Sequence, residues 1–283
     1  MTTNDKQWDI IIRPHRRWFD LRIGELWRYR DMIMLFVWRD FVSVHKQTIL
    51  GPLWYLIQPI LTNLTFTVIF GSIAKLPTDN LPPFLFYMSA TVIWTYFSNC
   101  LLKTGDTFIG NTNLFGKVYF PRLAVPISML ISNLITFVIQ FVLFLFFFVY
   151  FILNKAPIHP NLWILFTPIL VLMMAGLGLG FGILISSLTT KYRDLRFLVQ
   201  FGVQLLMYAT PVVYSITSVP ARFQIFVRLN PLTPIIETFR YAFLGSGTIQ
   251  PFELLYSFIF MLVSVLIGAL IFNRVEATFM DTV

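Results

Sequence analysis

The chain has 283 residues, of which 57% are hydrophobic and only 12% are charged, and its formal net charge at pH 7 is +8. A soluble globular domain carries about 25% charged residues, so this composition excludes an ordinary soluble protein and predicts an integral membrane protein. Cys100 is the one cysteine, which excludes an intramolecular disulfide framework and a zinc cluster built on cysteine.

The amino-terminal segment, residues 1–51, is basic and holds no stretch long enough to cross a bilayer. Its first 30 residues contain no apolar run of the kind found in a cleavable signal peptide. Within Leu26–Lys46, the apolar run Met32–Trp38 is short, and Trp27 and Trp38 flank it. Tryptophan favours the headgroup level of a bilayer, so we predict an amphipathic helix in the cytoplasmic interface. The alternative is a helix that serves only as an anchor.

Six apolar stretches follow, each near the 20 or so residues that a helix needs to cross a bilayer. None of them contains Asp, Glu, Lys or Arg. They cover Pro52–Ala74, Phe84–Leu102, Leu123–Leu153, Leu162–Leu188, Phe197–Ile216 and Leu254–Asn273. The predicted fold is therefore an all-α integral membrane protein with a six-span domain at residues 52–273 and a cytoplasmic tail at residues 274–283.

The distribution of positive charge predicts the orientation of these spans. An even number of spans puts both termini on one side of the membrane, and sixteen of the 21 Lys and Arg residues fall on that side. Cytoplasmic loops collect Lys and Arg, so we expect both termini to be cytoplasmic.

The loop between the second and third predicted spans reads DTFIGNTNLFGKVYFPR, from Asp106 to Arg122, and almost matches a phosphate-binding P-loop. Five residues instead of four separate Gly110 from Gly116, and Val118 replaces the hydroxyl residue that would hold magnesium. The motif also requires a preceding strand, whereas an apolar span precedes this loop. The loop is rich in aromatic residues for a connector, so we predict a short amphipathic docking helix. The alternative is a plain solvated loop.

The sequence GLGLGFG, from Gly176 to Gly182, resembles a dinucleotide-binding fingerprint but lacks its spacing. Gly176 and Gly180 are one helical turn apart, as are Gly178 and Gly182. Small residues at this spacing allow another helix to approach closely, so we predict close helix packing along this span.

The outer segment Ser218–Gly247 is apolar but is interrupted by Pro220, Pro231 and Pro234 and ends at Gly245 and Gly247. We predict two short re-entrant helices, with helix starts at Asn230-Pro231 and Thr233-Pro234. Glu237 and Arg240, three positions apart, are expected to pair. The alternative is an outer loop with a helix packed against the bundle.

The chemistry that the chain lacks also narrows its function. Ion-coupled transporters carry ionisable residues inside their spans, and the predicted spans here have none. The carboxylates are scattered singly and the three histidines lie far apart, so we expect no catalytic site and no metal. If the chain transports, we expect a partner to supply the energy.

Short motifs in order along nearly the whole chain resemble the membrane subunits of type-2 ABC transporters that export polysaccharides, namely O-antigen, capsule and teichoic acid permeases. They are LWRYRD at Leu26–Asp31, RDF at Arg39–Phe41, KQTILGPLWYLIQP at Lys46–Pro59, FPRLAVPIS at Phe120–Ser128, KYRDLRFLVQ at Lys191–Gln200, TPVVY at Thr210–Tyr214 and NPLTPIIETFRYAFLG at Asn230–Gly245. Val44-His45 departs from the basic-aromatic pair expected there.

The resemblance implies a homodimeric channel in the bacterial inner membrane that exports a polyprenyl-diphosphate-linked glycan, with membrane lipids around it and no nucleic acid partner. It implies that two copies of a separate ATP-binding subunit hold the ATP and magnesium, so that this chain is not an enzyme and binds no cofactor. It also implies a coupling helix within Asp106–Phe120 that docks on this subunit, for which the candidate residues are Asp106, Asn111, Asn113, Phe115, Lys117 and Tyr119. Glu237 and Arg240 would belong to an outer gate.

Two further sets of candidates combine the resemblance with side-chain chemistry. Arginine binds phosphate oxygens with two donors, and the candidates for the lipid-diphosphate entrance are Arg28, Arg30, Arg39, His45 and Lys46. Aromatic rings suit stacking on sugars, and the candidates for the channel wall are Trp54, Tyr87, Trp94, Tyr208 and Tyr214.

Other functions remain open at this stage. The same scaffold could export a small hydrophobic drug or a lipid. A membrane-embedded glycosyltransferase or acyltransferase would need paired carboxylates or histidines at a membrane face, which are not evident. A purely structural membrane anchor would not need the outer helices.

Overall fold

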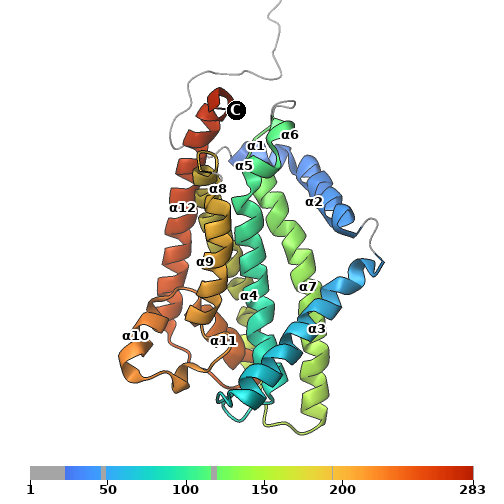
Figure 1. Cartoon of the computed structure of the whole chain (residues 1–283), viewed down its shortest axis with the longest axis vertical. Coiled ribbons are helices and arrows are strands. Elements are labelled where there is room, and N and C mark those ends of the chain that lie inside the picture. Colours follow the sequence, from blue (N-terminus) through green and yellow to red (C-terminus); the bar gives the residue numbers. More distant parts are fainter. Residues whose placement is uncertain (1–22, 46–48, 116–119, 193, 283) are drawn as a thin grey trace, which may run out of the picture.

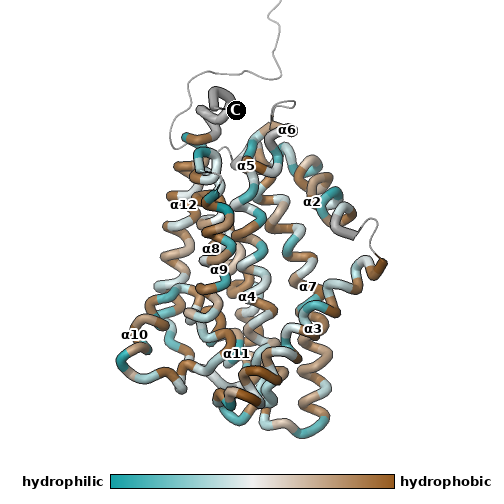
Figure 2. Tube along the Cα trace, in the orientation of Figure 1, coloured by the Kyte–Doolittle hydropathy of each residue, from teal (hydrophilic) through white to brown (hydrophobic). Residues whose placement is uncertain are grey.

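A computed structural model describes residues 23–45, 49–115, 120–192 and 194–282 of the chain (Figure 1). Every regular element among these residues is helical, as the composition predicts. The long helices run side by side, with polar residues gathered near the ends of the bundle and apolar residues along its length (Figure 2).

Five described helices are long and apolar enough to cross a membrane. They are the continuous helix Gly51–Ile73, which comprises η1 (Gly51–Leu53), α3 (Trp54–Phe66) and the π-helix η2 (Thr67–Ile73), then α4 (Pro83–Gly105), α7 (Ala124–Leu153), η3 (Leu162–Phe166) with α8 (Thr167–Thr189), and α12 (Pro251–Thr282). The first four coincide with predicted spans to within three residues at each end. Helix α12 continues past the predicted end at Asn273 without a break.

The predicted span Phe197–Ile216 is shorter in the structure, where α9 covers only Leu195–Ala209. Its 15 residues span about 22 Å at about 1.5 Å per residue, less than the hydrocarbon core of about 30 Å. The helix stops because Thr210 precedes Pro211, and a residue before proline avoids the helical conformation. Thr210 is extended, with φ −109° and ψ 144°. The chain then turns through the 3-10 helix η4 (Ile216–Ser218).

Helix α8 lies between α4 and α12 and packs closely on both. A Cβ atom added to Gly178 would lie 2.7 Å from Cβ of Cys100, and one on Gly182 would lie 2.6 Å from Cβ of Thr104. On the α12 side, a Cβ atom on Gly180 would lie 2.6 Å from Oγ of Ser264. The predicted close packing at these glycines is therefore confirmed, and it involves two neighbouring helices rather than one.

The amino-terminal helices α1 (Ile23–Arg28) and α2 (Arg30–His45) lie at one end of the bundle, and α2 packs on α7 (Figure 1). Ile33, Phe36 and Val37 are buried, whereas the other face of α2 exposes Met34, Leu35 and Trp38. The same face also exposes Arg30, Asp31, Arg39 and Ser43, so it mixes polar with apolar side chains.

Where a short docking helix is predicted within Asp106–Phe120, the described residues form two short helical turns, α5 (Thr107–Gly110) and α6 (Thr112–Phe115). Gly110 and Asn111 are weak helix formers, and Asn111 leaves the helical conformation with φ −120°. Phe108 stacks on Phe272 of α12 at 4.6 Å, so that α5 is tied to the end of the bundle.

The outer segment forms α10 (Ala221–Leu229) and α11 (Thr233–Leu244). Helix α11 begins at Thr233, with Pro234 in its first turn, and ends at Gly245, whose φ of 75° suits glycine. The start at Thr233-Pro234 and the end at Gly245 were both predicted from the sequence. The second predicted start, at Asn230-Pro231, is wrong, because Oδ1 of Asn230 accepts a hydrogen bond from Leu232 N and forms a turn instead.

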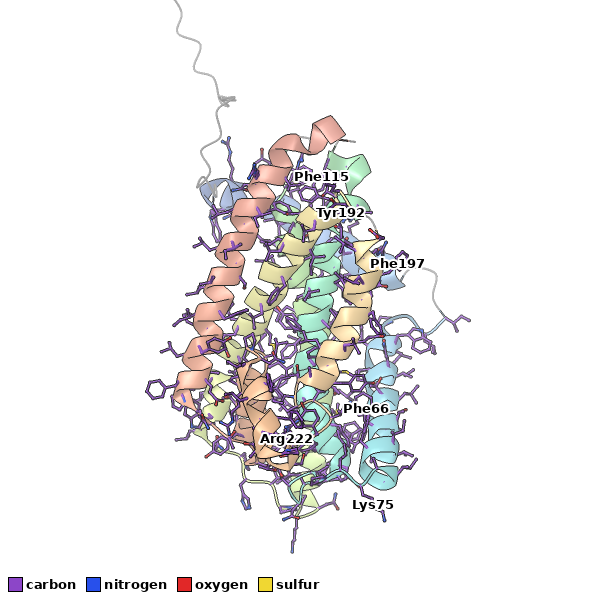
Figure 3. The ribbon with its side chains drawn as sticks, turned by 60° about the vertical axis from the view of Figure 1, so that its left-hand side comes forward. Phe66, Lys75, Phe115, Tyr192, Phe197 and Arg222 are labelled. Atoms are coloured by element: carbon purple, nitrogen blue, oxygen red, sulfur yellow. The ribbon has the colours of Figure 1, made fainter. Side chains whose placement is uncertain are left out.

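Residues predicted to share one side of the membrane lie at one end of the bundle (Figure 3). Phe115 and Tyr192, both assigned to the cytoplasmic side, lie near one end, and Lys75 and Arg222, both assigned to the outer side, lie toward the other.

We predict that Gly182→Ala destabilises the bundle by about 1 to 3 kcal/mol, because the added methyl group overpacks the contact between α8 and α4. The measurement is the unfolding temperature of the purified protein in detergent. The control is Gly202→Ala on α9, where an added Cβ has no neighbour within 4 Å and alanine favours the helix. Equal unfolding temperatures for the two variants would contradict the proposed packing.

Candidate functional site

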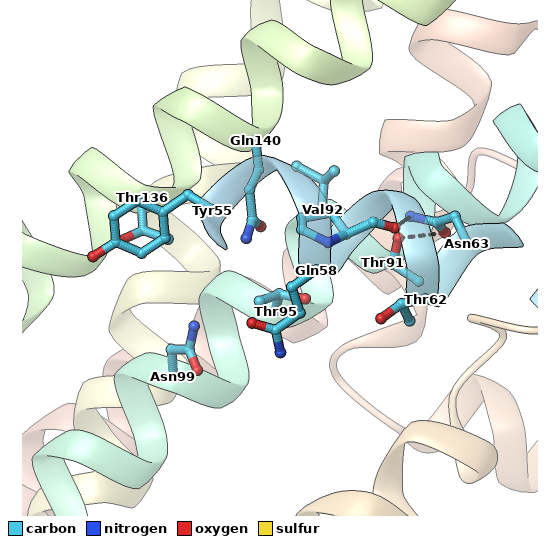
Figure 4. A pocket seen from close by; sticks show the side chains of 11 residues that line it. Tyr55, Gln58, Thr62, Asn63, Thr91, Val92, Thr95, Asn99, Thr136 and Gln140 are labelled. Atoms are coloured by element: carbon cyan, nitrogen blue, oxygen red, sulfur yellow. Dashed lines mark hydrogen bonds between the residues drawn. The ribbon is translucent and has the colours of Figure 1, made fainter. Parts of the chain in front are cut away.

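A polar pocket of about 160 Å³ opens between α3, α4 and α7, in the body of the helix bundle (Figure 4). It is lined by Tyr55, Gln58, Pro59, Thr62, Asn63, Thr91, Val92, Thr95, Asn99, Thr136 and Gln140. None of these eleven side chains carries a charge, and nine have a hydroxyl or amide group. We call this set of residues the polar groove.

The groove results from helical periodicity in three separate spans. Side chains three or four positions apart lie on the same face of a helix. Helix α3 contributes Tyr55, Gln58 and Thr62, whereas α4 contributes Thr91, Thr95 and Asn99 at this spacing. Thr136 and Gln140 of α7 are also four positions apart. Each span therefore presents a polar stripe at the place where the three helices meet.

Asn63 fixes the position of α3 against α4. Its side chain is fully buried, its Nδ2 donates to the Pro59 carbonyl at 2.8 Å, and its Oδ1 accepts from Thr91 Oγ1 at 2.9 Å. The buried hydrogen bond between Asn63 and Thr91 joins α3 and α4 beside the pocket.

The chemistry of the groove suits a neutral ligand with many hydroxyl groups. A hydroxyl group both donates and accepts hydrogen bonds, and a side-chain amide offers two donors and one acceptor oxygen. Such groups can exchange partners with successive sugar hydroxyls. A lining without charge provides no counter-ion for a phosphate.

Helices α3 and α9 both contact α4 and lie on either side of it in Figure 1. The rest of the described chain covers these two helices poorly. Asn63 is the one buried residue of α3, and Val203 is the one buried residue of α9. The described chain therefore leaves α3, which lines the groove, and α9, on the other side of α4, poorly covered.

The five aromatic candidates for the channel wall lie in different environments, and none of them lines the groove. Tyr87 and Trp94 of α4 are buried in the core, whereas Trp54 of α3 and Tyr208 of α9 are about half exposed. Tyr214 is half-buried in the connection after α9. These residues remain candidates for a channel wall in an assembly.

The described candidates for a lipid-diphosphate entrance lie on α1 and α2. Arg28 is exposed. Arg30 lies 5.7 Å from the Trp27 ring centre and 3.8 Å from a carboxylate oxygen of Asp31. Arg39 pairs with Asp40 at 2.8 Å and lies over the ring of Phe36. The His45 side chain and Lys46 lie outside the described residues.

The described candidates for the docking residues lie in different environments. Asp106, at the junction of α4 and α5, lies 3.0 Å from Arg196 of α9, and burial raises its pKa while the arginine charge opposes this rise. Asn111 donates to the Thr107 carbonyl at 3.0 Å. Phe115 is 4% exposed and packs between Phe108 and Phe120, so its ring belongs to a core rather than to a docking surface. The Asn113 side chain, Lys117 and Tyr119 lie outside the described residues.

The predicted pairing of Glu237 with Arg240 is confirmed, with 2.8 Å between Oε1 and Nη1, but the pair is buried rather than at the outer surface. Nη2 of Arg240 also donates to the Pro211 carbonyl at 2.8 Å, and its guanidinium group lies 4.0 Å from the ring centre of Phe86 on α4. The pair therefore joins α11, α4 and the connection that follows α9.

A second polar cluster at the same end is centred on Asp79, in the connection between η2 and α4. Its carboxylate accepts hydrogen bonds from Ser215 at 2.7 Å, Thr217 at 3.1 Å and Ser246 at 2.8 Å. Three connections that are distant in sequence are thereby held together at the outer end of α9.

The sequence prediction missed the polar groove. Its polar residues are spread over three apolar spans, and only Tyr55 and Gln58 lie within one of the quoted motifs, KQTILGPLWYLIQP. The available signal was the three- and four-residue spacing of hydroxyl and amide side chains within three successive spans.

Comparison with known proteins identifies relatives over most of the chain. The sequence profile of the ABC-2 type transporter family matches residues 32–244. A Klebsiella pneumoniae protein named O-antigen export system permease protein RfbA is 26% identical over 253 residues, which is 89% of this chain and 94% of the relative. A Myxococcus xanthus protein of the same name is 25% identical over 226 residues, which is 78% of this chain and 83% of the relative.

We predict that Arg240→Ala costs about 3 to 5 kcal/mol of stability, because it leaves the buried Glu237 carboxylate without a positive charge to balance it. The matched control is Arg228→Ala. Arg228 pairs with Glu253 at 2.7 Å, but both side chains are partly exposed, so we expect a loss of about 1 kcal/mol or less. Denaturant unfolding in detergent measures both values, and equal losses would contradict a structural role for the buried pair.

Proposed function

The chain belongs to the ABC-2 type transporter family, and on that premise we propose that it is the transmembrane subunit of an ATP-driven polysaccharide exporter. Its substrate is a polyprenyl-diphosphate-linked glycan, with O-antigen as the first candidate, which moves from the cytoplasm to the outer side of the inner membrane. The curated relatives, whose names specify O-antigen export, support this substrate class.

The observation that carries the proposal is the uncharged polar groove in the body of the bundle. Nine hydroxyl- or amide-bearing side chains line it at membrane depth, where polar groups are costly unless they find partners. A glycan supplies these partners in every successive sugar unit. A small hydrophobic drug would offer no hydrogen-bonding groups to this lining, so the groove favours the glycan over that alternative.

The proposed energy source is a separate ATP-binding subunit, present in two copies, which holds the ATP and magnesium. It docks at the end of the bundle that carries α1, α2, α5 and α6. The five candidate spans are apolar, as expected of a transporter that uses no ion relay within the membrane. In this scheme the chain itself is not an enzyme and binds no cofactor.

A second copy of the chain completes the channel. The uncovered faces of α3 and α9 then become the interface and the channel wall, so that two grooves face one path. Helix α9 and the buried residues that follow it, from Thr210 to Ile216, together form the sixth crossing. Both termini are cytoplasmic, α10 and α11 enter the membrane from the outer side, and the arginines of α1 and α2 receive the diphosphate.

Reconstituted export tests the function. Proteoliposomes that contain the chain and its ATP-binding partner should protect an added lipid-linked glycan from an external glycosidase only when ATP is supplied. The double variant Gln58→Leu with Thr62→Val keeps the volume of the groove but removes hydrogen-bonding groups at about 1 kcal/mol each. We expect it to export roughly tenfold more slowly while it still assembles with the partner.

The control for the groove variants is Thr65→Val. Thr65 lies on the same helix, but it is exposed and donates to the Leu61 carbonyl rather than lining the groove, so export should be unchanged. Equal export by the control and the groove variant would remove the groove from the mechanism. ATP hydrolysis by the chain without its partner, or no ATP-dependent protection with it, would refute the function.

A further inference from the structure

Helix α9 is held firmly at its outer end and weakly along its length. Val203 is its one buried residue, and an added Cβ at Gly202 would meet nothing within 4 Å. At the outer end, Asn230 Nδ2 donates to Thr210 Oγ1 at 2.8 Å, and Arg240 donates to the Pro211 carbonyl. The described contacts are those of a helix anchored at one end.

The inner end of α9 lies next to α5. Helices α5 and α6 form the docking segment, which we propose to contact the ATP-binding subunit. Arg196, in the first turn of α9, lies 3.0 Å from Oδ2 of Asp106. Asp106 is both the last cap of α4 and the first cap of α5. The pair therefore connects a channel-side helix with the base of the docking segment, although ninety residues separate the two in sequence.

In contrast to α9, the docking segment is tied to α8. Phe108 N donates to Ser186 Oγ at 3.3 Å, and Thr189 Oγ1 donates to the Gly105 carbonyl at 3.3 Å. A force on α5 consequently acts on a rigid unit that comprises the ends of α4 and α8. Arg196 provides a polar connection from that unit to the less tightly held α9.

The ion pair is unsuited to a mainly stabilising role. The side chains of Arg196 and Asp106 are 48% and 30% exposed, and exposed ion pairs contribute little to folding. An exposed pair can break and re-form as the distance between its partners changes. A contact of this kind suits a moving connection better than a permanent clamp.

We infer that Asp106 and Arg196 are positioning residues that transmit the movement of α5 to α9. When the ATP-binding subunit displaces α5, the pair pulls the inner end of α9, and α9 pivots about its outer anchor and changes the width of the path beside α4. This inference rests on the proposed function and assigns the coupling to one pair of side chains.

The test compares Asp106→Asn, Arg196→Gln and the double exchange Asp106→Arg with Arg196→Asp in the reconstituted exporter. Arg196→Gln should hydrolyse ATP at a rate close to that of the wild type, and in both single variants glycan export per ATP should fall by about fivefold or more, the lower range of typical coupling between sites. The double exchange should restore export. The control is Lys191→Gln. It removes a positive charge from the connection between α8 and α9, close to Arg196 in sequence, and should have no effect.

A second readout follows α9 directly and does not require export. Maleimide labelling of Gly202→Cys should change rate when a non-hydrolysable ATP analogue is added to the complex. This response should disappear with Arg196→Gln and return with the double exchange. The native Cys100 is buried and should contribute little labelling.

Wild-type export by the single variants, or no recovery of either readout in the double exchange, would overturn the inference. Absence of glycan export by the unmodified complex would instead refute the proposed function. The labelling measurement would still report whether the pair couples the nucleotide state to α9.

Discussion

The close packing of α8 against α4 and α12 is the contact on which the rest of the structure depends. Lipid is as apolar as the helix surfaces, so helices in a membrane associate through van der Waals contact, for which small residues are needed. Gly178 and Gly182 allow α4 to approach closely, and Gly180 allows the same for α12. This contact places α4 in the centre of the bundle, with one side fixed on α8 and the other side available to α3 and α9.

The function that we propose follows from that free side of α4. Its hydroxyl and amide groups meet those of α3 and α7 and form an uncharged groove, while two poorly covered helices flank the same surface. A hydroxyl-rich chain can exchange hydrogen bonds with such a wall as it moves, without a fixed charge to hold it. The buried pair of Glu237 and Arg240 fixes the outer end of α9, so the inner end is the place where a partner can act on it.

Much of the architecture could be predicted from the sequence, because bilayer thickness and helical periodicity leave few alternatives. Five of the six spans, the packing role of the Gly176–Gly182 run and the pairing of Glu237 with Arg240 followed from length and spacing. The helix at the fifth predicted span was predicted to be too long, because the apolar sequence continues past Thr210-Pro211. A residue before proline disfavours the helical conformation, and α9 ends there. The docking segment was predicted as one helix because its composition was weighed more heavily than the break at Gly110 and Asn111.

The site was harder to predict than the fold. Whether an aromatic residue such as Tyr87 or Tyr208 faces the core, the lipid or a channel depends on the rotation of its helix, which a uniformly apolar span does not reveal. The polar groove depends in addition on which faces of three helices meet, and that information lies in tertiary contacts such as the bond between Asn63 and Thr91.

If the glycan travels along the free side of α4, cross-linking during transport will capture it there. A photo-reactive amino acid is placed at Thr95, in the groove, or at Val142, on the exposed face of α7, and the complex is illuminated while ATP and a tagged glycan are present. We expect ATP-dependent capture of the glycan at position 95 and none at position 142. Equal capture at both positions, or export without capture at position 95, would contradict it.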